Sequence, residues 1–232
     1  MSVPQLPLAL RYPPDQRLES FIAAPQGAIA QLRELAQVPG ADWLFLAGAT
    51  GTGKTHLALA LCADAEQAGR RSAYLRLTAA RGRLREALEA LEGVDVVALD
   101  GLEAVAGDRN DEIALFDFHN RARGTGLNLL YAARDVPDLL DLVLPDLRSR
   151  LSQNARILLH PLDDAARADV LRDRAQRRGL VLEEAAIDWM LSRTDRNLAS
   201  LVALLDRLDR ESLAAQRKIT VPFLRQVIDP AV

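Results

Sequence analysis

The residues from Gly48 to Thr55 form a sequence suited to phosphate binding. They read Gly-Ala-Thr-Gly-Thr-Gly-Lys-Thr, with Gly51 and Gly53 inside the run and Lys54 before the final threonine. Glycines let backbone N–H groups wrap a phosphate at a helix start, a lysine brings charge to the β- and γ-oxygens, and a threonine hydroxyl suits Mg2+. We therefore predict a site for ADP or ATP with Mg2+. The alternative is an ordinary glycine-rich turn.

The segments on either side of this run fit the same interpretation. Residues 43–47 are apolar and predict a buried parallel strand, and residues 54–68 carry apolar side chains at helical spacing. We include His56, in the first turn of that helix, among the cofactor-binding residues. Lys54 is one of two lysines among 29 basic residues, so a compact ammonium stands where phosphate chemistry requires one.

An acidic residue further along the chain predicts the other half of the site. Residues 94–100 form an apolar run that ends in Asp100. An acid at the carboxyl end of a parallel strand can reach the Mg2+ shell beside a phosphate loop. We assign Thr55 and Asp100 to the Mg2+, although a strand-end aspartate can also be a turn residue. The next residue is Gly101, which cannot activate water, and the nearest further acid is Glu103.

The composition excludes several classes of protein. With 232 residues, 49% of them apolar and 26% charged, the chain can fold as one domain plus a smaller one. A single cysteine, Cys62, cannot form an internal disulfide, and no signal sequence or membrane-length apolar run is present, so we expect a cytoplasmic protein. The net charge is −3, and residues 161–232 carry 12 basic and 12 acidic side chains. We therefore expect any contact with DNA to be indirect.

The order of patterns predicts an α/β fold with a doubly wound parallel sheet. Five apolar runs read as strands, at 43–47, 73–77, 94–99, 127–133 and 155–159. They alternate with helical patterns at 26–38, 54–68, 82–92 and 109–124. Only helices follow, at 164–178, 183–193, 197–217 and 220–228. We predict an extended, proline-rich segment over 1–20, a nucleotide-binding α/β domain over 21–160 and a small all-helical domain over 161–232.

Several motifs together resemble the AAA+ module of the DnaA family of bacterial replication initiators. They are Gly48–Thr55, the strand ending at Asp100, Glu103–Asp108, Phe116–Arg121, Arg134–Pro137 and Pro145–Leu151. The similarity stops where the initiator continues into its duplex DNA-binding domain. The tail from Leu205 to Phe223 is similar to the Hda family, the regulatory inactivators of the initiator. The resemblance implies an AAA+ domain followed by a helical lid.

The resemblance implies that the N-terminal segment binds the replicative sliding clamp. The residues that correspond to the family's clamp-binding peptide are Gln5, Leu6, Leu8 and Leu10. An extended segment stiffened by proline loses little entropy on docking, and two leucines can fill an apolar groove. Burying them contributes a few kcal/mol, which suits a contact of roughly micromolar affinity. The alternative is an apolar tail without a partner.

The resemblance also implies that Arg150 is an arginine finger acting in trans. Such a residue reaches across a subunit interface to the ATP of a neighbour and stabilises the charge that develops on its γ-phosphate. The alternative is a surface ion pair with Asp146, four residues earlier on a short helix.

Three departures from the family pattern predict slow turnover at the chain's own site. Gly101 replaces a second acid, and the polar sensor after the fourth strand falls on Arg134 or Asp135. Ala199 stands where the family carries a lid arginine, and Arg196 lies three residues away. We expect nucleotide to bind well and to be hydrolysed slowly.

The leading hypothesis is a regulator that docks on the DNA-loaded clamp and stimulates hydrolysis of initiator-bound ATP. Under this hypothesis the partners are the initiator DnaA and the clamp, and the protein can also form homo-oligomers. We expect no binding to a membrane. A self-sufficient AAA+ ATPase such as a helicase loader is the first alternative. A DNA-binding initiator paralogue is the second, and the acidic composition disfavours it.

Overall fold

The structure is a computed structural model that describes residues 16–193, 198–215 and 219–228. These residues form two compact units, each described by itself. The larger unit comprises 16–21, 26–47 and 54–157. The smaller one comprises 22–25, 48–53 and the described residues from 158 onward.

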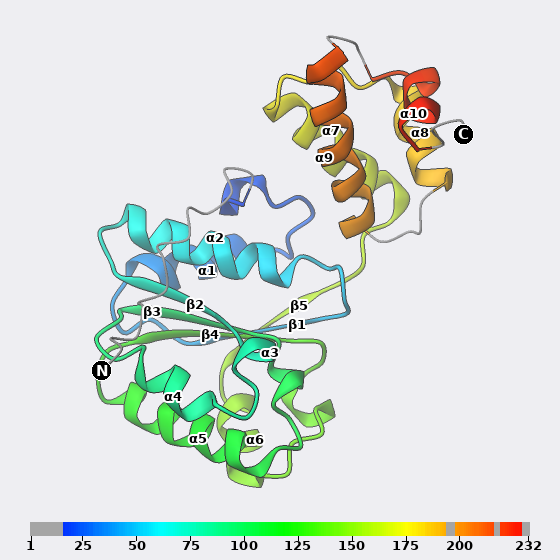
Figure 1. The fold of residues 1–232 in the computed structure, drawn as a ribbon. Helices are drawn as coiled ribbons and strands as arrows, with labels where there is room; N and C mark the ends of the chain where they lie inside the picture. Colours follow the sequence, from blue (N-terminus) through cyan, green and yellow to red (C-terminus); the bar gives the residue numbers. More distant parts are fainter. Residues whose placement is uncertain (1–15, 194–197, 216–218, 229–232) are drawn as a thin grey trace, which may run out of the picture. The chain divides into compact units, whose positions relative to one another are not determined.

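A five-stranded sheet lies at the centre of the nucleotide-binding fold (Figure 1). Its strands are β1 Leu44–Gly48, β2 Ser72–Arg76, β3 Val96–Asp100, β4 Asn128–Ala133 and β5 Ala155–Leu159, in the spatial order β2-β3-β4-β1-β5. The pairs β2–β3, β3–β4 and β4–β1 are parallel. Each of the five predicted apolar runs forms a strand, so the α/β prediction is confirmed. The central strands β3 and β4 are buried throughout, as continuous apolar runs require.

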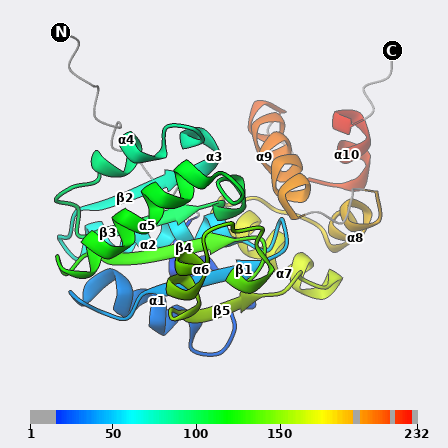
Figure 2. The same cartoon turned by 90° about the horizontal axis from the view of Figure 1, so that it is seen from below.

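Helices cover both faces of the sheet in the larger unit (Figure 1). α1 Ala28–Gln37 and α2 Lys54–Gln67 pack together on one face. α4 Leu84–Glu89, α5 Arg109–Arg123 and α6 Pro145–Ser152 lie on the other, which faces the viewer in Figure 2. The sequence patterns did not predict α3 Leu77–Ala80 or the short 3-10 turns at Leu18–Ser20, Leu102–Ala104 and Pro137–Leu139. Segments this short have too few residues to show a hydrophobic period.

The carboxylate of Glu112 fixes the start of α6 to α5. It is fully buried and accepts hydrogen bonds from the backbone N–H groups of Gly107 at 2.8 Å, Val143 at 3.0 Å and Leu144 at 2.7 Å. Buried charges are tolerated only when they are hydrogen-bonded in this way. The position of α6 is therefore set by polar contacts as well as by its buried leucines.

The smaller unit contains four helices among its described residues. They are α7 Asp164–Arg177, α8 Glu184–Arg193, α9 Leu198–Ala215 and α10 Val221–Ile228. Asp163 caps α7 by accepting a hydrogen bond from the N–H of Ala166, as its type and position predict. Leu171, Met190 and Leu224 belong to an apolar core that these helices share.

Two expectations from composition can be compared with the structure. Cys62 is buried inside α2, as a small apolar thiol would be. Within the described ranges, no helix is both long enough and apolar enough to cross a membrane.

His119 on α5 lies between an aromatic core and two arginines. Its Nε2 accepts a hydrogen bond from Arg123 Nε at 3.4 Å, so in the neutral ring Nδ1 carries the proton and donates to the Tyr131 hydroxyl at 3.0 Å. Burial, followed by the positive charges of Arg123 and Arg150, lowers the pKa of His119 from 6.5 to about 4.

This lowered pKa predicts a loss of stability in acid. Between pH 6.5 and 4, His119 binds a proton in the unfolded chain but stays neutral in the folded chain. The free energy of unfolding therefore falls as the pH falls. The loss should reach about 3 kcal/mol by pH 4, and His119→Gln should lose less over the same interval. Urea unfolding at pH 7, 6, 5 and 4 measures it. Identical pH profiles for the two proteins would contradict the prediction.

Candidate nucleotide-binding site

The loop between β1 and α2 has the backbone that a phosphate cradle needs. Gly51 and Gly53 have φ angles of +84° and +95°, a region that favours glycine. A Cβ on Gly48 would lie 2.5 Å from the Leu159 carbonyl oxygen and 2.8 Å from Thr52 Oγ1, so a side chain has no room there. The glycines are therefore required by the loop itself, and α2 begins directly after them, at Lys54.

Thr55 and Asp100, the predicted Mg2+ residues, are in direct contact. Thr55 Oγ1 donates a hydrogen bond to Asp100 Oδ2 at 2.6 Å. Asp100 ends β3 and is only 6% exposed, so its carboxylate is held rather than solvated. A hydroxyl and a carboxylate side by side match the few protein oxygens that Mg2+ takes when phosphates and water complete its shell. These residues fit the ion that the motif implies.

Lys54 lies half-buried among charged groups. Burial lowers its pKa, while the charges of Glu103 and Asp100 oppose that shift. Arg134 lowers the pKa further and Asp135 raises it, so both candidate sensor residues act electrostatically on Lys54. A bound phosphate would supply the negative charge that a partly desolvated ammonium favours.

Tyr74 is a member of this site that the sequence did not reveal. From β2, its hydroxyl donates to Asp100 Oδ2 at 2.8 Å, and Arg76 Nε donates to the Tyr74 oxygen at 3.4 Å. Burial raises the pKa of Tyr74 to about 12, so the hydroxyl keeps its proton at neutral pH. Parallel pairing of Arg76 with Asp100 brings this strand end beside the carboxylate. The apolar run that predicted this strand contains Tyr74, but nothing in the run indicated that Tyr74 contacts Asp100.

The residues after β3 and β4 are engaged with one another. Gly101 has a φ of +84°, and its N–H donates to the Ala132 carbonyl at 2.9 Å. Glu103 Oε2 accepts from the backbone N–H of Arg134 at 3.0 Å. This carboxylate therefore fixes the loop that follows β4, and the choice between Arg134 and Asp135 as sensor stays open.

His56 makes contacts other than those we expected of a cofactor residue. Its Nε2 lies 3.0 Å from the Arg17 carbonyl oxygen and 3.4 Å from Ser20 Oγ, and its ring packs edge-on against Phe21. The imidazole thus holds the segment that precedes α1. Its assignment to the cofactor remains a prediction.

Arg150 lies exposed in the last turn of α6. The alternative interpretation paired it with Asp146, but among the described residues Arg150 forms no ion pair. Leu147 and Leu151 are buried and anchor the helix. The helix is fixed and the guanidinium is left facing solvent.

Some predicted residues lie outside the described part of the chain. They are Gln5, Leu6, Leu8, Leu10 and Arg196, together with the side chain of Ala199. Over the described ranges, no group of three or more His, Cys, Asp or Glu residues is placed to hold a metal ion. Mg2+ would therefore depend on Thr55, Asp100 and the nucleotide.

Replacing Lys54 by alanine should weaken nucleotide binding at least tenfold. The variant removes the charge nearest the phosphates, and a charged hydrogen bond is worth about 1.5–3 kcal/mol. Calorimetric titration with ADP and ATP measures the effect. Lys218→Ala, which removes the only other lysine of the sequence, is the control and should bind normally. Unchanged affinity in Lys54→Ala would contradict the phosphate-cradle interpretation.

Solved structures of AAA+ proteins share this fold. Domain III of the Thermotoga maritima replication initiation protein DnaA has a TM-score of 0.78 at 22% identity, covering 94% of this chain and 98% of that one. AMPPCP-bound DnaA from Aquifex aeolicus has a TM-score of 0.71 at 24% identity, covering 88% and 68%. The Thermotoga maritima RuvB branch migration motor has a TM-score of 0.66 at 19% identity, covering 94% and 72%.

Two family profiles match the sequence. The profile of the IstB-like ATP binding proteins matches residues 11–126, half of the chain, and that of the Hda lid domain matches residues 164–228. The first covers the phosphate loop and Asp100, and the second covers the four helices of the smaller unit. The chain therefore belongs to the IstB-like ATP binding proteins, and its residues 164–228 match the Hda lid domain.

Proposed function

We propose that this protein regulates the initiation of chromosome replication by stimulating ATP hydrolysis on the initiator DnaA. It binds ADP or ATP with Mg2+, docks on the DNA-loaded sliding clamp through residues 5–10, and presents Arg150 to the initiator's nucleotide. The initiator is thereby converted to its ADP form. The observation that carries the proposal is the state of Arg150, an exposed arginine on a rigidly anchored helix of a chain with an Hda lid.

The geometry of α6 suits an arginine that acts on a partner. Glu112 holds the residues before the helix, and Leu147 and Leu151 bury its inner side. The helix therefore needs little reordering when Arg150 meets a γ-phosphate, and the guanidinium fork can contact two oxygens at once. Its charge stabilises the partner's transition state, where negative charge on the transferred phosphoryl group is greatest.

The chain's own site favours binding over turnover. Mg2+, when bound, neutralises charge on the β- and γ-phosphates. Asp100 Oδ2 already accepts from two hydroxyls, those of Thr55 and Tyr74. Glu103 is hydrogen-bonded to the Arg134 backbone, and Gly101 has no side chain. The position directly after Asp100 therefore offers no carboxylate to orient an attacking water, which supports a regulator over a self-sufficient motor.

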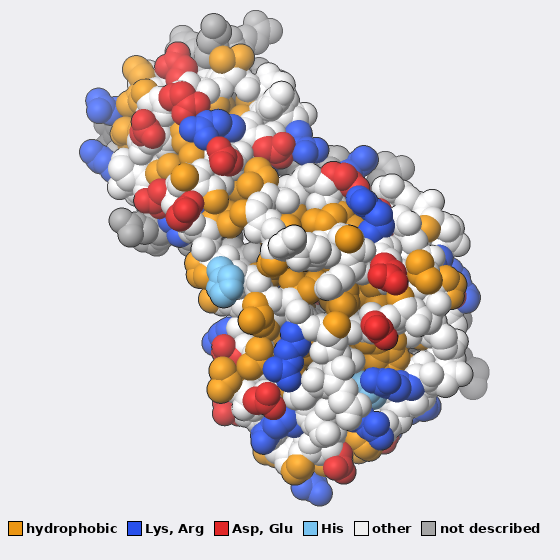
Figure 3. All heavy atoms as spheres, turned by 180° about the vertical axis from the view of Figure 1, so that it is seen from behind, with side chains coloured by type: hydrophobic (Ala, Val, Ile, Leu, Met, Phe, Trp, Pro, Cys, Tyr) orange, Lys and Arg blue, Asp and Glu red, His pale blue; other side chains and the backbone are white. Residues whose placement is uncertain are grey.

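The charge distribution also disfavours a DNA-binding initiator paralogue. On the face shown in Figure 3, basic and acidic side chains of the described residues are interspersed, without a continuous basic stripe. Several arginines are neutralised by ion pairs, for example Arg172 with Glu184 at 2.7 Å and Arg178 with Asp206 at 2.6 Å. Affinity for duplex DNA depends on cations that can replace counterions. We therefore propose that DNA is reached through the clamp.

Arg150→Ala should abolish most of the stimulation of initiator ATPase. Supplying an arginine finger changes rates by about 10³–10⁵ in well-studied systems, so little stimulation should remain. Hydrolysis of labelled ATP on the initiator, with loaded clamp present, measures it. Arg150→Lys should rescue poorly because an ammonium lacks the planar fork.

The control for this experiment is Arg121→Ala, which removes an exposed arginine from α5. Both variants should fold and bind nucleotide and clamp, and Arg121→Ala should retain stimulation. Wild-type stimulation by Arg150→Ala would overturn the in-trans mechanism. Fast turnover by the pure protein, within about 1–100 s⁻¹ and lost in Asp100→Ala, would instead favour the self-sufficient ATPase.

Replacing both Gln5 and Leu8 with alanine should abolish binding to the clamp without changing the melting temperature. Terminal segments contribute little to folding unless they are tied to the domain. Size-exclusion co-elution with the clamp and thermal unfolding measure the two effects. A double variant that still co-elutes would show that the clamp-binding segment has been wrongly assigned.

A further inference from the structure

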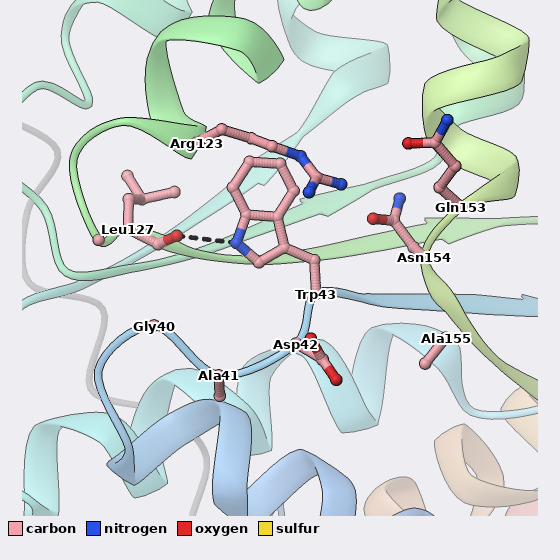
Figure 4. Close-up of a pocket in the computed structure, with 10 residues that line it drawn as sticks. Gly40, Ala41, Asp42, Trp43, Arg123, Leu127, Gln153, Asn154 and Ala155 are labelled. Atoms are coloured by element: carbon pink, nitrogen blue, oxygen red, sulfur yellow. Dashed lines mark hydrogen bonds between the residues drawn. The ribbon is translucent and has the colours of Figure 1, made fainter.

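A pocket of about 380 Å³ lies at the amino end of β1, away from the phosphate-binding residues (Figure 4). Three segments line it. They are residues 40–43 before β1, Arg123 at the end of α5 with residues 126–127 before β4, and residues 153–155 at the start of β5. All three belong to the larger unit. No residue of the pocket takes part in the nucleotide site described above.

Arg123 brings a positive charge to this pocket. Its guanidinium lies over the Trp43 ring, 5.0 Å from the ring centre, and its Nε donates to His119. Trp43 is itself fixed, because its Nε1 donates to the Leu127 carbonyl at 2.8 Å. Among the described residues Arg123 forms no ion pair. The guanidinium is thus oriented, and no carboxylate from the described chain neutralises it.

Asn154 brings an unused acceptor to the same pocket. It is only 6% exposed, and its Nδ2 donates to the Leu151 carbonyl at 3.1 Å. Its Oδ1 has no hydrogen-bond partner among the described residues. Figure 4 shows this oxygen directed toward the space beside the Arg123 guanidinium. Buried polar atoms without partners are uncommon. We therefore expect Asn154 Oδ1 to accept a hydrogen bond from a ligand bound in the pocket.

We propose that this pocket binds an acidic side chain of a partner protein. The carboxylate pairs with the Arg123 guanidinium, and a main-chain N–H next to that acid donates to Asn154 Oδ1. A peptide supplies both groups within a few bonds of each other, and the partly buried indole of Trp43 offers an apolar wall for the intervening methylenes.

The charges of the pocket favour a single carboxylate over a phosphate group. Asp42 also lines the pocket, and its negative charge repels a dianion more strongly than a single carboxylate. A phosphate dianion also has no N–H to offer Asn154. A nucleobase is disfavoured because Arg123 covers the Trp43 ring and His119 packs edge-on against it at 4.8 Å.

The fluorescence of Trp43 provides a direct test. The chain has two tryptophans, and Trp189→Phe leaves Trp43 as the single indole. The probes are acetyl-aspartate-amide and its isostere acetyl-asparagine-amide, which differ in one charge. We expect the Trp43 fluorescence to change and to saturate at about millimolar aspartate probe. The asparagine probe should bind at least tenfold more weakly. Equal response to both probes, or none, would overturn the proposal.

Variants identify the residues responsible. Arg123→Ala and Asn154→Leu should each lower the affinity for the aspartate probe about tenfold. Arg121→Ala, an exposed arginine on the same helix that does not line the pocket, should bind as wild type. Calorimetry with unmutated protein gives the same comparison of probes without any substitution. Tighter binding of inorganic phosphate than of the aspartate probe would overturn the acidic-peptide assignment in favour of a general anion site.

Discussion

The carboxylate of Asp100 is the point on which the nucleotide-binding half of the molecule depends. One oxygen, Oδ2, accepts from Thr55 at the start of α2 and from Tyr74 on the neighbouring strand β2. The contact from Tyr74 requires the register in which Arg76 lies opposite Asp100. A shift of one residue would turn Tyr74 to the other face of the sheet, because side chains alternate along a strand. Strand register and helix start are therefore set at one buried acid.

This arrangement holds the Asp100 carboxylate in one position. Two hydroxyl donors fix the Asp100 carboxylate, and burial within the fold keeps it from solvent. Such an acid is well placed to orient an ion's shell, because two hydroxyl donors hold its carboxylate in one position. Glu103 is engaged by the Arg134 backbone in the same way. A site of this kind can act as a fixed structural element while the reaction proceeds on a partner.

The sequence predicted what depends on local pattern and could not predict what depends on register or on distant segments meeting. The five strands, the glycine-rich loop and the strand-end Asp100 each leave a pattern within a few residues. Tyr74 leaves none, because its role exists only once β2 pairs with β3. The pocket combines Trp43, Arg123 and Asn154 from three separate segments, and the unsatisfied oxygen of Asn154 becomes visible only when the side chains are placed.

The charges around His119 connect the proposed finger with the proposed pocket. Arg123 and Arg150 both lower the pKa of this histidine, so the two guanidinium groups share one electrostatic environment. Protonating His119 would add a third positive charge there, and the buried imidazole stays neutral instead. In the described chain neither arginine is paired with an acid. Two cations that form no ion pair with an acid attract negative groups, and the proposals assign a γ-phosphate to Arg150 and a carboxylate to Arg123. A partner could offer both a γ-phosphate and a carboxylate. Its carboxylate would bind Arg123 and so align its γ-phosphate for reaction at Arg150.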